Sequence, residues 1–107
     1  MDCIFCKIRD RVIAKEFTYE DEEIMVFPDI NPDKPIHLLV VPKKHVEDYL
    51  EFNDANLNIK VKNIIGKVIK DQKLDDGKGY RVSINGGGAQ LVKHVHFHIM
   101  GPISKME

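Results

Sequence analysis

The stretch "VKHVHFHIM", residues 92–100, alternates histidine with apolar residues and therefore predicts a β-strand. Because side chains on a strand alternate between its two faces, the histidines share one face and the apolar residues share the other. The histidines are His94, His96 and His98, three of the five in the chain. Such a stripe admits three interpretations: wetted polar side chains on a half-buried strand, three ligands of one metal ion, or catalytic groups with different tasks.

Strand spacing argues against a single ion bound by all three histidines. Same-face neighbours on a strand stand about 6.6 Å apart, and three of them span about 13 Å. Zinc binds imidazole nitrogen at about 2.0–2.1 Å, so a site using all three would be strained. Residues 85–102 contain no Asp or Glu, which argues against a dinuclear site bridged by carboxylates. A division of tasks is the remaining reading, with one end of the stripe on a metal and the middle histidine as nucleophile or acid–base group.

Four segments earlier in the chain also have the composition of strands. They are "KEFTYED" (15–21), "EIMVFPD" (23–29), "HLLVVPK" (37–43) and "YRVSI" (80–84). The acidic run "EDEE" between the first two indicates a hairpin, and the glycine-rich "NGGGAQ" (85–90) joins the fourth to the histidine strand. Backbone N–H groups in such a loop are suited to holding a phosphate, although glycines also form plain flexible turns.

One long amphipathic helix is predicted between Ala55 and about Lys73, where apolar residues recur at intervals of three and four. Asn53 or Asp54 is its expected N-cap. Two short helical segments are predicted, in "IFCKIRDR" (4–11) and within "HVEDYLEFND" (45–54). The order of these elements predicts an α+β fold: a five-stranded, mostly antiparallel sheet with one long helix and a short N-terminal helix, in a single domain spanning 1–107.

Composition and charge narrow the class of protein. The chain has 107 residues, 43% hydrophobic and 31% charged, which indicates a globular domain rather than a disordered chain. Its 16 basic and 17 acidic residues give a net charge of −1, which argues against binding a nucleic acid polymer through a basic surface. No apolar run approaches the roughly 20 residues of a membrane span, and the N-terminus lacks the pattern of a signal peptide. A cytoplasmic protein is therefore expected.

The only two cysteines, Cys3 and Cys6, form a C-x-x-C pair. In a reducing compartment such a pair indicates redox chemistry or metal binding rather than a structural disulfide. A redox pair of the thioredoxin type follows a strand, and none is predicted before Cys3, so metal binding is favoured. A tetrahedral structural zinc site needs two further ligands, and we expect His45, after a strand end, and His94, the first histidine of the stripe. The alternative is a pair of reduced thiols beside an ordinary surface histidine.

Several blocks of sequence occur together in the order of a known family. They are "CIFCKI" (3–8), "VFPDINP" (26–32), "HLLVVPKKH" (37–45), the long helix and "NGGGAQLVKHVHFHIMG" (85–101). With H-x-H-x-H followed by two apolar residues, the sequence resembles the histidine triad (HIT) nucleotide-binding hydrolases over nearly its whole length. Within that family it is most similar to the small nucleoside phosphoramidases of the protein kinase C-interacting protein-like branch, in their bacterial, zinc-binding form.

The resemblance implies roles for individual residues around a purine nucleotide. His96 would attack the α-phosphorus to form a nucleotidyl-histidine intermediate, His98 would bind the phosphate, and His37 would complete the polar set. Asp29 would hold the ribose hydroxyls. The remaining nucleotide-binding positions are Phe5, Phe27, Ile30 and Leu39 around the base, and Asn85, Ala89, Gln90 and Leu91 near the phosphate. The resemblance also implies structural Zn²⁺ on Cys3, Cys6, His45 and His94, and a homodimer joined through the long helix and a strand.

Simpler explanations compete for some of these residues. Asp29 before "INP" also suits a turn, His37 also suits the start of a strand, and the apolar residues around the base also suit a plain core. Leu91 and Ala89 depart from the family, which usually has Ser, Thr or Glu at the first position and often Gly at the second. The leading expectation is hydrolysis of nucleoside 5′-phosphoramidates or similar conjugates. The alternatives are dinucleoside polyphosphate hydrolysis and a nucleotide-binding interaction module with weak catalysis.

Overall fold

Five strands form one antiparallel sheet in the order β1-β2-β3-β5-β4, in a computed structural model that describes residues 3–105. The strands are β1 (Tyr19–Glu20), β2 (Ile24–Pro28), β3 (Ile36–Pro42), β4 (Arg81–Ile84) and β5 (Phe97–Gly101). The helices are α1 (Ile4–Arg9), the short 3-10 helix η1 (Tyr49–Glu51) and α2 (Ala55–Asp71). The predicted α+β class, the order of elements and the antiparallel sheet are confirmed.

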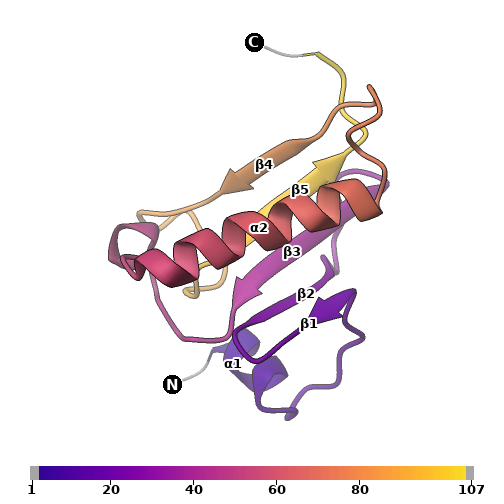
Figure 1. The fold of residues 1–107 in the computed structure, drawn as a ribbon. Helices are drawn as coiled ribbons and strands as arrows, with labels where there is room; N and C mark the ends of the chain where they lie inside the picture. The colour runs from indigo at the N-terminus through magenta and orange to yellow at the C-terminus, as the bar shows by residue number, and fades with distance from the viewer. Residues whose placement is uncertain (1–2, 106–107) are drawn as a thin grey trace.

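The alternation of side chains assigns the strand residues to two separate cores, one on each face of the sheet. Ile24 and Val26 of β2 pack with the buried residues of α2. Met25 and Phe27, the alternate residues of the same strand, pack with α1. In Figure 1, α2 lies across one face of the sheet, and α1 lies at the β1–β2 end. The second core, on the α1 face, borders the histidines.

The long helix α2 begins at one of the two predicted caps. The Asp54 side chain accepts a hydrogen bond from the backbone N–H of Leu57 at 3.0 Å, so Asp54 rather than Asn53 is the N-cap. The helix ends slightly before the predicted boundary, and Lys73 beyond it has a positive φ of 58°. None of the helices described between residues 3 and 105 is long and apolar enough to cross a membrane.

The predicted strand over 92–100 is wrong in its first half, because β5 starts at Phe97. Before β5 the chain leaves the sheet and approaches the loop after β3, where the Val95 N–H donates to the carbonyl of Val46 at 2.7 Å. Val95 still packs in the α2 core, whereas His94 reaches the opposite side and contacts a cysteine. The side chains of His94 and Val95 thus still point to opposite sides, although this segment is not a strand.

Candidate functional site

All five histidines gather near the α1 face of the sheet. The ring centroids of His96 and His98 are 5.0 Å apart, and those of His37 and His98 are 5.1 Å apart. His45 and His94 form a second pair, at 4.9 Å. His94 and His96 are only 0% and 6% exposed, so the interpretation of the stripe as wetted side chains is wrong. Buried imidazoles need specific partners, and these partners fix their protonation.

A chain of hydrogen bonds fixes where His37 and His98 carry their protons. The backbone N–H of Asp33 donates to His37 Nδ1 at 3.0 Å, so neutral His37 has its proton on Nε2. This Nε2–H group donates a hydrogen bond to His98 Nδ1 at 2.9 Å, so His98 Nδ1 carries a lone pair. Neutral His98 then carries its own proton on Nε2, a buried atom with no hydrogen-bond partner among residues 3–105. This N–H is a donor available to a bound molecule.

His96 has the opposite tautomer. Its Nδ1 lies 2.7 Å from the carbonyl oxygen of His94, and since a carbonyl only accepts, Nδ1 must donate. The lone pair of neutral His96 is therefore on Nε2. Burial lowers the pKa of His96 and of His98, and the charges of His96 and His37 lower the pKa of His98 further. The pair thus combines a nucleophilic nitrogen with a neutral N–H donor.

A cavity of about 370 Å³ lies against this histidine pair. Most of the predicted nucleotide-binding residues line it: Phe5, Phe27, Asp29, Ile30, Leu39, Asn85, Ala89, Leu91, His96 and His98. The lining also includes residues that sequence reasoning missed: Ile4, Ile8, Ile13, Ala14, Lys15, Pro28, Asn31 and Val92. The helical spacing of the first two could have indicated them, but no sequence pattern pointed to residues 13–15.

Phe5 and Phe27 form an apolar wall of the cavity. Their rings meet edge to face, with centroids 5.7 Å apart. Phe5 also lies edge-on to His96, at 5.0 Å. Phe5 and Phe27 are 5% and 2% exposed, and Leu39 is buried beside them. These residues therefore belong to the core and line the cavity at the same time.

Asp29 combines a turn with a position at the cavity. One carboxylate oxygen accepts a hydrogen bond from the backbone N–H of Asn31 at 2.9 Å, as in the turn considered above. The other oxygen lies 3.4 Å from His37 Nε2 and 4.0 Å from His98 Nδ1. A carboxylate held in this way keeps acceptor capacity for hydroxyl groups of a bound molecule.

Two of the residues predicted for catalysis or nucleotide binding do not line the cavity. His37 stands behind His98 and reaches the cavity only through the hydrogen bond between their rings. Gln90 turns toward the loop after β3, where its Nε2 donates to the carbonyl of Glu47 at 3.1 Å. Neither side chain is therefore in position to touch a molecule in the cavity directly.

The glycine-rich loop uses several of its N–H groups internally. Gly87 N–H donates to Asp48 Oδ1 at 2.7 Å, and Gly88 N–H donates to Gln90 Oε1 at 2.9 Å. Ala89 N–H donates within the loop at 3.2 Å. Gly87 and Gly88 have φ of 65° and 98°, a conformation that favours glycine. These three donors are thus engaged in shaping the loop instead of being free for a phosphate.

The C-x-x-C pair and two histidines form a second cluster, at the start of α1. The predicted ligand atoms of Cys3, Cys6, His45 and His94 all lie within 4.8 Å of one another. Sγ of Cys3 is 3.3 Å from His94 Nδ1, and Sγ of Cys6 is 3.4 Å from His45 Nδ1. A tetrahedral zinc ion, with bonds of about 2.3 Å to sulfur and about 2.0–2.1 Å to nitrogen, would hold such atoms about 3.5 Å apart. The cluster therefore fits one metal ion with little rearrangement.

His94 presents the correct nitrogen to this cluster. Its Nε2 lies 2.6 Å from the carbonyl oxygen of Pro42, so Nε2 donates and the lone pair of Nδ1 faces the cysteines. Burial lowers the pKa of His94 to about 4, which keeps the ring neutral. Burial and the neighbouring Cys3 raise the pKa of Cys6 to about 11, so a bound cation is needed to keep its thiolate at neutral pH.

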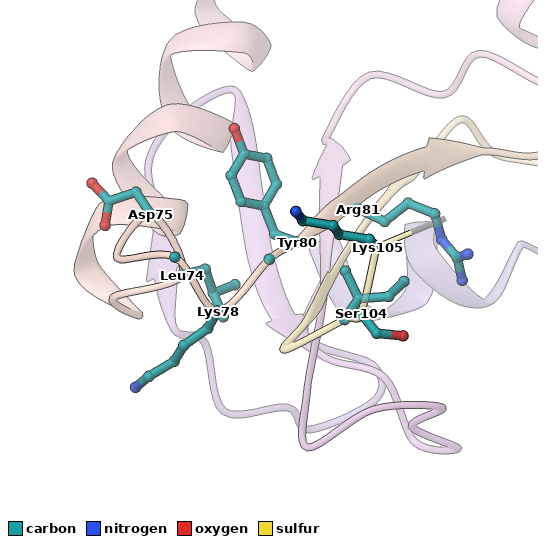
Figure 2. A pocket seen from close by; sticks show the side chains of 10 residues that line it. Leu74, Asp75, Lys78, Tyr80, Arg81, Ser104 and Lys105 are labelled. Atoms are coloured by element: carbon teal, nitrogen blue, oxygen red, sulfur yellow. The ribbon is translucent and has the colours of Figure 1, made fainter. Parts of the chain in front are cut away.

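A larger hollow, of about 640 Å³, lies away from the histidines. Figure 2 shows it between the segment that follows α2 and residues near the C-terminus. The labelled side chains around it are Leu74, Asp75, Lys78, Tyr80, Arg81, Ser104 and Lys105. Its lining includes no histidine, no cysteine and no predicted site residue. The cavity of about 370 Å³ that His96 and His98 line is therefore the candidate functional site.

Known proteins are similar to this chain in sequence and in architecture. Residues 2–107 match the family model described as "Scavenger mRNA decapping enzyme C-term binding". A HIT-like protein of Methanocaldococcus jannaschii is 43% identical over 100 residues, covering 92% of this chain and 77% of that protein. The protein HitA of Neisseria gonorrhoeae is 37% identical over 102 residues, covering 94% of this chain and 95% of that protein.

Solved structures agree. A HIT family hydrolase from Legionella pneumophila Philadelphia 1 superposes with a TM-score of 0.88 at 36% identity, covering 96% of this chain and 95% of that one. A histidine triad protein from Clostridium difficile gives a TM-score of 0.86 at 40% identity, covering 100% and 97%. These likenesses extend over nearly the whole chain, including the histidine cluster, and the chain therefore belongs to the histidine triad (HIT) family.

Proposed function

We propose that the protein is a hydrolase that binds a purine nucleotide conjugate in the cavity and cleaves it at the α-phosphorus. The observation that carries the proposal is the pairing of two opposite tautomers: a lone pair on His96 Nε2 beside an N–H on His98 Nε2. Both residues line a cavity whose other walls are largely apolar. A nucleotide needs such a combination, an apolar slot for its base and polar groups at its phosphate.

The two tautomers support a two-step displacement through a nucleotidyl-histidine. In the first step His96 Nε2 forms a bond to phosphorus and the bond to the leaving nitrogen breaks, while the neutral His98 Nε2–H donates a hydrogen bond at the phosphate and the leaving nitrogen takes a proton from water. In the second step water attacks phosphorus and gives up a proton to solvent, and the His96–phosphorus bond breaks to release the nucleoside monophosphate and neutral His96. The carbonyl of His94 accepts a hydrogen bond from the Nδ1–H of His96 throughout, which stabilises the positive charge on the phosphorylated ring.

Nucleoside 5′-phosphoramidates and similar conjugates are the proposed substrates. His96→Ala should abolish hydrolysis of an AMP phosphoramidate and leave AMP binding, measured by calorimetry, largely intact. Unchanged turnover would contradict the role given to His96. A panel of phosphoramidates, acyl-nucleotides and dinucleoside polyphosphates, tested beside this variant, separates the substrate classes.

A nucleotide-binding module with weak catalysis is the second candidate, and one residue favours it. Leu91 lines the cavity and its side chain is fully exposed, yet it offers no hydrogen bond to a phosphate or a leaving group. If AMP binds but every substrate in the panel turns over at the rate of His96→Ala, this second function replaces the first.

We also propose that the cluster of Cys3, Cys6, His45 and His94 holds one structural Zn²⁺. When bound, the ion would tie α1 to the loop after β3 and to the segment before β5, and its four protein ligands would leave no position for a substrate. Metal analysis of the purified protein should give about one zinc ion per chain. Cys3→Ser should lower both the metal content and the melting temperature, and a metal-free wild type of equal stability would contradict the proposal.

A homodimer formed through α2 and β4 is proposed as the working assembly. β4 lies at the edge of the sheet, and a groove of about 440 Å³ beside it is lined by Tyr49, Phe52, Asn58, Ile59, Val61, Lys62, Ile65, Val82 and Phe97. Ile59 and Val82 are 61% and 41% exposed, as expected of a surface that a second copy covers. Sedimentation should detect a dimer that Ile59→Glu converts to a monomer, whereas Val12→Glu, also exposed but distant from the groove, should not.

A further inference from the structure

We propose that Lys15 makes the cavity select guanine over adenine. The inference rests on the proposed function and extends it, because it names the base of the nucleotide. Lys15 belongs to the irregular segment between α1 and β1 and lines the cavity. No pattern in the sequence marked it, and only the folded chain brings it to this site.

The register of the sheet gives the separation between the histidines and Phe27, the residue that Lys15 contacts. Phe27 of β2 pairs with Leu39 of β3, and Leu39 pairs with His98 of β5. Neighbouring strands lie about 4.8 Å apart, so Phe27 is about 10 Å across the sheet from His98. A nucleotide with its phosphorus at the histidines extends its base toward Phe27. Lys15 Nζ lies 5.3 Å from the centre of the Phe27 ring, and therefore at the base end of the cavity.

The ammonium group of Lys15 lies at the base end of the cavity, and no carboxylate among residues 3–105 forms an ion pair with it. Among the residues that line the cavity, Lys15 and Asp29 are the charged ones apart from the histidines. The Asp29 carboxylate accepts a hydrogen bond from the N–H of Asn31 and lies 3.4 Å from His37 Nε2, so it is directed at the histidines. Within residues 3–105, Lys15 forms no ion pair, and its ammonium contacts the Phe27 ring instead.

The chemistry of the ammonium group decides which purine fits. It has three N–H donors and no acceptor. Guanine presents two neighbouring acceptors, O6 and N7, along one edge, whereas adenine presents N7 beside an amino group that is itself a donor. Lysine therefore gains two hydrogen bonds from guanine, but it meets a donor when adenine is bound. Because the group is half-buried, this difference is only partly screened by water.

Calorimetric titration of the full-length protein with three nucleoside monophosphates tests the inference. We expect GMP and IMP to bind about 10-fold more tightly than AMP, within the range that a bidentate contact to guanine provides. IMP keeps O6 and N7 but lacks the 2-amino group of guanine, so it isolates the edge that Lys15 would read. In Lys15→Met, a variant of similar length without donors, GMP and IMP should lose this advantage while AMP binding changes little.

A control variant and the results that would contradict the proposal complete the design of the experiment. Lys70→Met removes one lysine from the exposed side of α2, far from the cavity, and should keep the wild-type preference. Equal affinities for GMP and AMP in the wild type, or a preference that survives Lys15→Met, would overturn the role of Lys15 and leave the proposed hydrolase intact. Absence of binding by all three nucleotides would overturn both.

Discussion

The ring of Phe5 lies edge-on against the ring of His96, with the centroids 5.0 Å apart and an interplanar angle of 79°. Phe5 stands between Cys3 and Cys6 in the sequence, so the segment that carries both cysteines of the cluster also carries a wall of the cavity. The Cys3 Sγ atom accepts a hydrogen bond from Cys6 N–H at the start of α1. The metal cluster and the cavity thus share one short helix.

If the cluster holds zinc as proposed, removal of the ion should weaken nucleotide binding. Without an ion, α1 loses the bonds that tie both cysteines to His45 and His94, and Phe5 is held less firmly beside His96. We expect the Kd for AMP to rise by about 5-fold to 100-fold, the usual range for two coupled sites, and AMP to tighten metal binding by the same factor. Calorimetry on loaded and chelated protein measures the first value, and competition with a chelator measures the second. Equal affinities in both experiments would show that the sites are independent.

His37→Ala should slow catalysis without weakening binding. The substitution removes the N–H that points at His98 Nδ1, so His98 is no longer held with its proton on Nε2. We expect kcat to fall about 100-fold, the lower end of the effect of losing one hydrogen-bond donor to the transition state, while the Kd for AMP stays nearly unchanged because His37 does not line the cavity. Asp33→Ala is the control: it keeps the backbone N–H that donates to His37, and it should retain the wild-type kcat.

Leu91→Ser should raise turnover at almost no cost in stability. The Leu91 side chain is fully exposed at the cavity, so replacing it should change the free energy of unfolding by less than about 0.5 kcal/mol. A hydroxyl there supplies a hydrogen bond to the phosphate or the leaving group, and we expect kcat to increase several-fold. Leu50→Ser, at a position 82% exposed and outside the cavity, should leave kcat unchanged. A variant at Leu91 with wild-type kcat would show that the apolar residue does not limit the reaction.

Asp21 should make stability depend on pH in the acid range. Burial raises the pKa of its carboxyl, but hydrogen bonds from the Tyr19 hydroxyl and the N–H groups of Glu23 and Ile24 outweigh this effect and lower the pKa to about 2. The folded state therefore favours the carboxylate. The resulting stabilisation is complete above the ordinary pKa of about 4 and is lost as the pH falls toward 2.

Urea denaturation of Asp21→Asn tests this expectation. At neutral pH the variant should lose about 1–2 kcal/mol of unfolding free energy, and its stability should vary less than that of the wild type between about pH 4 and pH 2. Glu22→Gln, in the same turn but exposed, should behave like the wild type. Parallel pH profiles for wild type and Asp21→Asn would contradict the role of the hydrogen bonds.

Local patterns predicted the elements that packing later confirmed. The apolar runs of β2 and β3 follow from burial on both faces of the sheet, and the helical period of α2 follows from burial of one of its faces. The start of β5 escaped prediction because His94 and Val95 are drawn out of the sheet by partners far away in sequence, Pro42 and Val46. Lys15 was expected at the start of a strand over 15–21, but β1 covers only Tyr19–Glu20, so Lys15 lies in an irregular segment whose neighbours strand alternation does not give.

The candidate site was predictable to the extent that it depends on the chemistry of side chains. Cys3, Cys6, His45 and His94 cluster as predicted, because the number and the geometry of zinc ligands limit which thiol and imidazole groups can form one site. The opposite tautomers of His96 and His98 could not be foreseen, because main-chain groups set them: the carbonyl of His94 and the N–H of Asp33. No side-chain pattern encodes where a carbonyl points.

The hydrogen bond from His96 to the carbonyl of His94 also limits which insertions, deletions and substitutions this segment can tolerate. His94 uses its side chain in the metal cluster and its main chain to orient His96, two positions further on. An inserted or deleted residue between them would break both relationships at once, and no single compensating substitution would restore them. The spacing of the two histidines is thus fixed by the reach of one peptide unit, whereas the identity of Val95 between them is free to drift among residues that fill the α2 core.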